Sequence, residues 1–260
     1  LRNGNGRISR LDDPDPVARV AYTGPLAVLV DRYSASASEI FAAAIQDYAR
    51  GVIIGQQTFG KGTVQNLYSL DQYLRSEGDK GFGQLTLTIG KYYRVTGEST
   101  QHRGVDPDIE LPSHINAELI GESVRDSALP WDTIPTARFR AGKPLDGTIS
   151  SLTSSYEERS KEDPNFRYQM DMIEAAEEMT ARKTLSLNIE ARRQEREDEL
   201  QRRLDRENER RAALGLAALE TLDDMEDDDI PDVLLDQAAG IVTDLAQMRE
   251  VDFMEPTASL

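Results

Sequence analysis

Residues 26–54 read LAVLVDRYSASASEIFAAAIQDYARGVII, and the order of residue types in this stretch indicates the fold class. The apolar run at residues 26–30 is short and rich in β-branched side chains, which favours a buried strand over a helix. Residues 36–49 carry apolar side chains on more than one helical face, so we expect a buried helix there. A second apolar run at residues 52–54 predicts another strand. Strand, helix and strand in this order indicate an α/β protein.

Further strands are expected later in the N-terminal half. Residues 84–89 alternate polar with apolar side chains, and the run continues through residues 91–97. We therefore predict one long or bent strand that is half exposed. Residues 104–108, which contain a glycine and a proline, interrupt the chain after it.

The C-terminal half has the composition of a helical domain, with helix-forming residues dominating from Ser151 onward. We expect helices at about residues 165–182, 189–213 and 233–248, and a loop in the acidic run 222–229. The helix at 189–213 is so charged that few of its side chains can face a core: Ile189, Leu200, Leu204 and a few alanines. The last helix recovers an apolar stripe: Leu234, Ala238, Ile241, Leu245 and Met248. We place the domain boundary between residues 125 and 126, so that residues 1–125 form the α/β domain and residues 126–260 the helical domain.

The net charge of −17 argues against some classes of partner. Residues 151–260 contain 29 acidic and 14 basic residues, a net charge of −15. Such an excess repels phosphate backbones and anionic lipids, so we expect no binding to nucleic acid or to membrane surfaces in this half. No run of residues approaches the ~18 apolar residues of a membrane-spanning helix, and residues 1–10 contain no apolar region of a signal peptide.

Ser36 is a candidate nucleophile because it lies between the predicted buried strand and the predicted helix. A sharp turn at this place can present a hydroxyl beside free backbone N–H groups. A structural role is also open, since Ser36 and Glu39 have the Ser-x-x-Glu spacing of a capping box. The segment alone favours the capping role.

Lys61 is a candidate general base in the glycine-rich segment 60–63. Gly55 and Gly60 have the spacing of a phosphate-binding loop, and the segment nearly matches that motif, which makes nucleotide binding an alternative. Position 62 is glycine where that motif needs serine or threonine, and residues 64–68 do not predict the required helix. A lysine between two glycines can instead enter an enclosed site, lose its proton and take one from a serine. The remaining alternative is an exposed lysine in a turn.

Other catalytic and metal chemistries have little support. The chain contains no cysteine, which excludes disulfides and thiolate zinc sites. The two histidines, His102 and His114, stand in no recognisable triad or metal motif, and the acidic run 223–229 lacks the spacing of a calcium loop. We expect no metal and no organic cofactor.

Three segments together resemble the signature of C-terminal processing peptidases, the tail-specific serine proteases. They are Ser-Ala-Ser-Ala-Ser-Glu-Ile at residues 34–40, Gln46-Asp47, and Thr-Phe-Gly-Lys-Gly-Thr-Val-Gln at residues 58–65. The similarity continues through residues 99–101 and 104–109, and residues 127–132 with the charged helical end resemble the large periplasmic branch in Gram-negative bacteria. The resemblance implies a ClpP/crotonase-like protease core in residues 1–125, followed by a helical C-terminal domain.

The resemblance also implies roles for individual residues. Ser36 is similar to the nucleophile of the family, Lys61 to its general base and Gln65 to the residue that orients the lysine. Asp47 matches an aspartate that is important in the periplasmic branch. The backbone N–H of Ala37, next to the nucleophile, would be one oxyanion donor.

Some parts of the family pattern are missing from this chain. The resembled enzymes have an upstream strand ending in Asn-Gly-Gly-Gly, which supplies a second oxyanion N–H, and a peptide-binding PDZ domain before it. We therefore expect this chain to be a fragment with weak or no activity. For the intact protein the resemblance implies a periplasmic serine endopeptidase that acts on proteins with nonpolar or unstructured C-terminal tails, with a possible adaptor lipoprotein as partner. The competing class is a non-catalytic binding or scaffold module built on the helical half.

Overall fold

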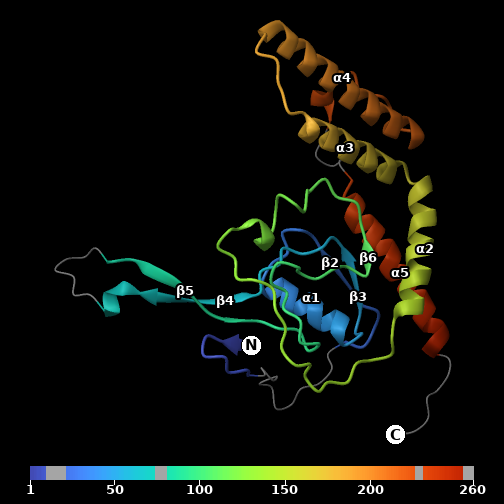
Figure 1. Ribbon diagram of the computed structural model, residues 1–260. Coiled ribbons are helices and arrows are strands. Elements are labelled where there is room, and N and C mark those ends of the chain that lie inside the picture. Colours follow the sequence, from blue (N-terminus) through green and yellow to red (C-terminus); the bar gives the residue numbers. More distant parts are fainter. Residues whose placement is uncertain (10–21, 74–80, 226–230, 254–260) are drawn as a thin grey trace. The chain divides into compact units, whose positions relative to one another are not determined.

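The structure is a computed structural model that describes residues 1–9, 22–73, 81–225 and 231–253. The chain forms two compact units, the first made of residues 1–110 and 115–145 and the second of residues 111–114 and 146–260. The boundary expected after residue 125 stays a prediction. The α/β class is confirmed, with mixed strands and helices in the first unit and helices in the second (Figure 1).

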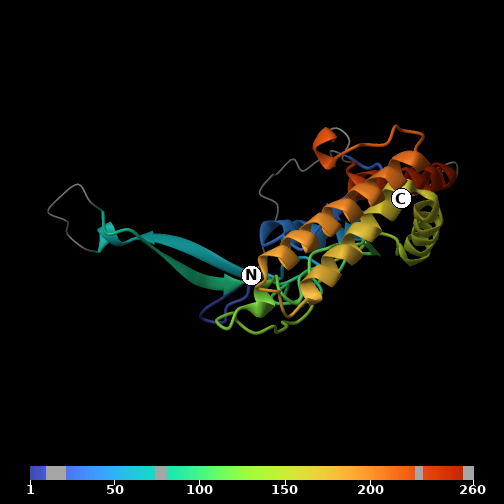
Figure 2. The same cartoon turned by 90° about the horizontal axis from the view of Figure 1, so that it is seen from above.

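The first unit contains the strands β1 (Arg2–Asn3), β2 (Ala27–Val30), β3 (Val52–Gly55), β4 (Thr63–Ser69), β5 (Gln84–Lys91) and β6 (Ile109–Glu110), the helix α1 (Ala37–Asp47), and the 3₁₀ helices η1 (Leu70–Gln72) and η2 (Glu122–Val124). Its strands form a parallel sheet in the order β2-β3-β6 and an antiparallel sheet in the order β1-β5-β4. In both views the β4–β5 hairpin extends away from α1 and the parallel sheet (Figures 1 and 2).

The parallel sheet and α1 share a small core. Ala42 and Ala43 of α1 are fully buried and pack with Val30 of β2, Ile53 of β3 and Val105. Alanines on the inner face let the helix approach the sheet closely, which sets the position of both helix ends. Because β2 and β3 are parallel, their carboxyl ends meet at one edge of the sheet, a common location for ligand and active sites in α/β folds.

Two expectations for this unit are wrong in part. Helix α1 is buried on one face only, because Phe41 is 54% exposed and Ile40 is 37% exposed. The strand expected through residues 91–97 ends at Lys91, because the chain turns at residues 94–97, where Gly97 has a φ of +96° and donates its N–H to the Arg94 carbonyl.

The second unit contains the helices α2 (Asp146–Glu162), α3 (Pro164–Ala181), α4 (Ile189–Ala213) and α5 (Val233–Phe253), and the 3₁₀ helix η3 (Leu222–Asp224). Helices α3 and α4 lie side by side (Figures 1 and 2). The side-chain oxygens of Asp163 and Asn188 cap the starts of α3 and α4, which explains where both helices begin. Residues 226–230 of the expected acidic loop lie outside the described residues.

The core of the second unit confirms the stripe on α5 and corrects the expectation for α4. Ala238, Ile241 and Leu245 are buried. On α4, Ile189 is 62% exposed and Leu200 is 43% exposed, whereas the ion-paired Glu207 and Arg210 are buried. A charged pair at i,i+3 can enter a core when its hydrogen bonds are satisfied within the pair, which a search for apolar residues does not detect.

Candidate active site

Ser36 lies in the turn that joins β2 to α1, at the helix N-cap position, with a φ of 57° and a ψ of −108°. N-cap residues normally have extended backbone, and a positive φ is uncommon for residues other than glycine. Ser36 therefore has the strained backbone of the first central residue of a type II′ turn. Its side chain still accepts from the backbone N–H of Glu39 as one half of a capping box, although with looser geometry than a standard cap hydrogen bond.

Glu39, one turn into α1, joins Ser36 to the segment around Lys61. Its side chain is fully buried. Its Oε2 accepts the Ser36 backbone N–H at 2.7 Å, which completes one half of the capping box, and the Lys61 backbone N–H at 2.8 Å. Since both distances end on one oxygen, the two nitrogens are at most 5.5 Å apart, the sum of the two bonds.

The second oxygen of Glu39 binds the same segment. Oε1 accepts the Thr58 hydroxyl and the Gly60 N–H, both at 2.6 Å. One carboxylate thus satisfies four donors, three of which lie about twenty residues further along the chain. The buried Glu39 carboxylate therefore holds the backbone of Ser36, the candidate nucleophile, close to the backbone of Lys61, the candidate base.

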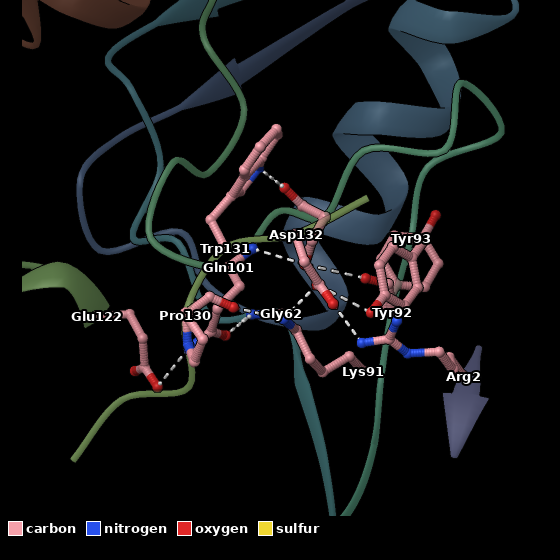
Figure 3. A network of polar contacts seen from close by, with 11 residues as sticks. Arg2, Gly62, Lys91, Tyr92, Tyr93, Gln101, Glu122, Pro130, Trp131 and Asp132 are labelled. Carbon is pink, nitrogen blue, oxygen red and sulfur yellow. Dashed lines mark hydrogen bonds and ion pairs between the residues drawn. The ribbon is translucent and has the colours of Figure 1, made fainter. Parts of the chain in front are cut away.

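The loop that carries Lys61 runs from the end of β3 to the start of β4, and it is supported on its other side by residues 99–104. Gly62 donates its N–H to Gln101 Oε1 at 2.9 Å, and His102 donates its N–H to the Gly60 carbonyl at 2.8 Å (Figure 3 shows the Gly62 contact). A Cβ at Gly62 would lie 2.7 Å from the Gln101 nitrogen, so only glycine fits.

The side chains predicted for catalysis are partly brought together. Lys61 Nζ donates to the Thr63 carbonyl at 3.3 Å, and the described structure contains no hydrogen bond between Lys61 Nζ and Ser36 Oγ. Ala37 is the first residue of α1 and is exposed, and within the described chain its N–H has no acceptor. Gln65 is exposed on β4, directly after a register shift between Val64 and Gln65 that changes the direction of the following side chains.

Asp47 lies away from these groups, at the C-terminal end of α1. Eleven helical residues place it about 15 Å along the axis from the Ser36 end. Its side chain is 4% exposed and accepts three hydrogen bonds of 2.5–3.1 Å from Arg94. The cation compensates for a carboxylate at a helix C-terminus, which would otherwise be unfavourable.

Asp132 is the centre of a second polar network in this unit (Figure 3). It accepts hydrogen bonds from Lys91 Nζ at 2.5 Å and from the Tyr93 hydroxyl at 3.0 Å, and it also binds Arg2. Burial, and then the hydrogen bond to Asp132, raise the pKa of Tyr93 to about 12. Burial alone would raise the pKa of Asp132, but the hydrogen bonds from Lys91, Tyr93 and Arg2 outweigh it and lower that pKa.

The structure gives no support to the alternative of a phosphate-binding loop. Strand β4 begins at Thr63, where that motif requires a helix. The N–H groups of Gly60, Lys61 and Gly62, which would have to face phosphate oxygens, already donate to Glu39 and Gln101. Across the described ranges, no group of three or more histidine or acidic side chains could hold a metal ion.

Comparison with known proteins fits these motifs. Residues 2–111 match peptidase family S41, and residues 115–247, about half of the chain, match the C-terminal domain of tail specific protease. The chain belongs to the tail-specific proteases. This confirms the resemblance inferred from the motifs.

Several similar proteins carry related names. The tail-specific protease of Haemophilus influenzae is 42% identical over 248 residues, which cover 94% of this chain and 35% of that protein. The carboxy-terminal-processing protease of Bartonella bacilliformis is 46% identical over 100 residues, which cover 38% of this chain and 21% of that protein. A solved photosystem II D1 C-terminal processing protease is 36% identical, with a TM-score of 0.29, over 38% of this chain and 23% of that chain. This chain therefore spans about a third of the length of its relative from Haemophilus.

Several residues of this tail-specific protease site were missed by the sequence analysis. Glu39 was assigned only its local capping role, and Gln101 only a place in a motif. Arg32 is 3% exposed and donates to the carbonyls of Ile120 and Thr58, both at 2.6 Å, so it holds residues 117–120 against the Lys61 loop. Burial lowers the pKa of this guanidinium. The available signal was a charged residue two positions after a strand, which is too common to identify a contact 88 residues away.

Proposed function

We propose that the intact protein is a serine endopeptidase in which Ser36 is the nucleophile and Lys61 the general base. The observation that carries this proposal is the shared Glu39 carboxylate, which holds the backbone nitrogens of Ser36 and Lys61 within 5.5 Å of each other. A lysine side chain with four methylene groups can reach across such a distance. Hydrogen bonds between catalytic side chains are often long before substrate binds, so the contact of Lys61 with Thr63 is compatible with this role.

The backbone of Ser36 supports a catalytic role over a purely capping role. A simple N-cap serine would have extended backbone, whereas Ser36 combines the capping box with a positive φ of 57°. Strained residues persist where the surroundings hold them, and they cluster at active sites. The four hydrogen bonds of Glu39 supply that constraint here.

The proposed reaction is acyl transfer. The neutral amine of Lys61 takes the Ser36 hydroxyl proton while Oγ attacks the peptide carbonyl carbon, and the negative charge that forms on the carbonyl oxygen faces the free N–H of Ala37. Lys61 then gives its proton to the leaving amine. Water hydrolyses the resulting ester of Ser36, which restores the hydroxyl. Gln65 would orient the lysine, and Asp47 would act at a distance through Arg94.

Substrates and setting follow from the family. We propose protein substrates with nonpolar or unstructured C-terminal tails, a periplasmic location and a possible adaptor lipoprotein. Among the described helices, none combines the length and apolar composition needed to cross a membrane. Because this chain spans 35% of the length of its Haemophilus relative, we propose that residues 1–260 alone cleave weakly or not at all.

The test is cleavage of an unstructured protein with a nonpolar tail by the full-length protein. Ser36→Ala and Lys61→Ala should each abolish cleavage, whereas the control variants Ser38→Ala and Lys143→Ala, at exposed positions, should cleave at the wild-type rate. A fluorophosphonate reagent should phosphonylate Ser36, with loss of fluoride, and fail to label the Ser36→Ala variant. Normal cleavage by a folded Ser36→Ala or Lys61→Ala variant would refute the assignment.

A further inference from the structure

The Lys61 loop is held from two sides, and Glu39 accounts for one of them only. On the opposite side, Gly62, the residue after Lys61, donates its N–H to Gln101 Oε1 at 2.9 Å. Gln101 is fully buried, and its own N–H donates to Ser99 Oγ at 3.1 Å. The Gly62 carbonyl accepts the Tyr92 N–H at 2.8 Å, so both polar groups of this peptide are engaged (Figure 3).

Glu122 determines which way the Gln101 amide points. Gln101 Nε2 donates to Glu122 Oε1 at 3.3 Å, and Glu122 is 6% exposed. An ionised carboxylate accepts hydrogen bonds and cannot donate them, so the amide nitrogen must face Glu122 and the amide oxygen must face Gly62. The backbone of Glu122 is fixed to the same loop, because its N–H donates to the Phe59 carbonyl at 3.0 Å.

Gly62 lies close against the backbone of Gln101 and the side chain of Ser99. A Cβ on Gly62 would meet the Gln101 nitrogen at 2.7 Å and Ser99 Oγ at 3.0 Å. Because the Gly62 N–H bonds to Gln101 Oε1, loss of that acceptor frees the Gly62 peptide and, with it, the neighbouring Lys61. A misplacement of about 1 Å in a catalytic group can reduce the rate by about 10²-fold.

We propose that Gln101 and Glu122 form a positioning pair that sets the location of the Lys61 amine. This inference rests on the proposed function of Lys61 as general base. Neither residue reaches the reacting atoms. Glu122 orients the Gln101 amide, the amide holds the Gly62 peptide, and this peptide fixes the residue before it.

The pair can be tested by exchanging its donor and acceptor in the full-length protein. Gln101→Glu keeps an acceptor for the Gly62 N–H but places a second carboxylate against Glu122, so the acceptor is pushed away. We expect kcat to fall by about 10- to 100-fold with KM within about twofold of wild type. Adding Glu122→Gln restores one donor and one acceptor in reversed order, and we expect kcat to return to within about threefold of wild type. Glu122→Gln alone should have a small effect, because its amide oxygen can still accept from Gln101.

Controls separate this inference from the proposed function and from simple misfolding. Thermal unfolding monitored by circular dichroism shows whether each variant is folded. If Gln101→Glu does not fold, Glu122→Ala replaces it, because it frees the Gln101 amide to rotate and should lower kcat in the same way. Wild-type kcat in the folded single variant, or no recovery in the double variant, would overturn the positioning pair even if Lys61→Ala is inactive. Wild-type activity of Lys61→Ala would overturn the general base itself.

Discussion

Replacing Glu39 by glutamine tests whether one carboxylate holds the proposed site together. The two side chains have nearly the same volume, so the substitution opens no cavity. The carboxylate accepts four hydrogen bonds, two on each oxygen. In glutamine one of these oxygens becomes an NH₂ group, which cannot accept, so two buried donors lose their partner whichever way the amide is turned.

The expected loss of stability follows from that count. A buried donor left without an acceptor costs about 1–3 kcal/mol, so two such donors should lower the free energy of unfolding of the first unit by about 2–6 kcal/mol. This is a large share of the roughly 5–15 kcal/mol that stabilises a typical domain. Glu98→Gln, at an exposed position in the same unit, should change it by less than about 0.5 kcal/mol.

The chain carries its own reporter for this measurement. Trp131 is the single tryptophan, and it belongs to the first unit. Its indole donates to the Ser99 carbonyl at 2.9 Å and lies under Arg103, whose guanidinium carbon is 3.5 Å from the ring centroid. Its fluorescence during urea denaturation therefore reports the unfolding of this unit. A loss for Glu39→Gln no larger than that of Glu98→Gln would refute the role assigned to the carboxylate.

Three further predictions concern single features of the same unit. Because the backbone of Ser36 is strained, Ser36→Gly should be at least as stable as wild type in urea denaturation, and about 1 kcal/mol more stable than Ser36→Ala. If wild type is the most stable of the three proteins, Ser36 is an ordinary helix cap. Asp47→Ala should lower the free energy of unfolding by about 3 kcal/mol, because it leaves Arg94 with an unpaired charge. In a protein that already carries Arg94→Ala, the same substitution should cost less than about 1 kcal/mol. Additive losses in this double-mutant cycle would argue against the ion pair. The pKa of Tyr93 is raised from the ordinary 10 to about 12, so the contribution of its neutral hydroxyl to stability is complete below pH 10 and is lost as the pH rises to about 12. The free energy of unfolding of wild type should therefore fall more steeply than that of Tyr93→Phe over this range. Parallel curves for the two proteins would contradict the shift.

The parts of the fold that depend on local pattern could be predicted from the sequence. The strands around α1 have continuous apolar runs, and α3 and α4 begin at residues whose neighbours Asp163 and Asn188 are strong caps. Strand β4 was not identified, because residues 63–69 are largely polar and the strand is stabilised by its pairing with β5. The exposed face of α1 was missed because composition does not show which face of a helix a sheet covers.

The site could be predicted at the level of motifs and not at the level of contacts. Ser36, Lys61, Gln65, Asp47 and Ala37 came from a family resemblance, and their roles stay predictions. The bond from Ser36 to Glu39 spans three residues and could be inferred from spacing. The bonds from Glu39 to Gly60 and Lys61, and from Gln101 to Glu122, span about twenty residues, and no local pattern encodes them. The strained φ of Ser36 was equally hidden, because glycine is the residue that normally signals it.

The four donors gathered on Glu39 also limit how this sequence can change over evolutionary time. Replacing Glu39 by a residue whose side chain accepts no hydrogen bond leaves Thr58 and the backbone of residues 36, 60 and 61 without an acceptor at once, and no single second substitution can restore all four. A sequence that changes at Glu39 must pass through a poorly folded intermediate. The start of α1 and the loop that carries Lys61 are therefore inherited together. Residues 66–67 and 84–88 of the β4–β5 hairpin are exposed and carry no such obligation, so they are free to diverge.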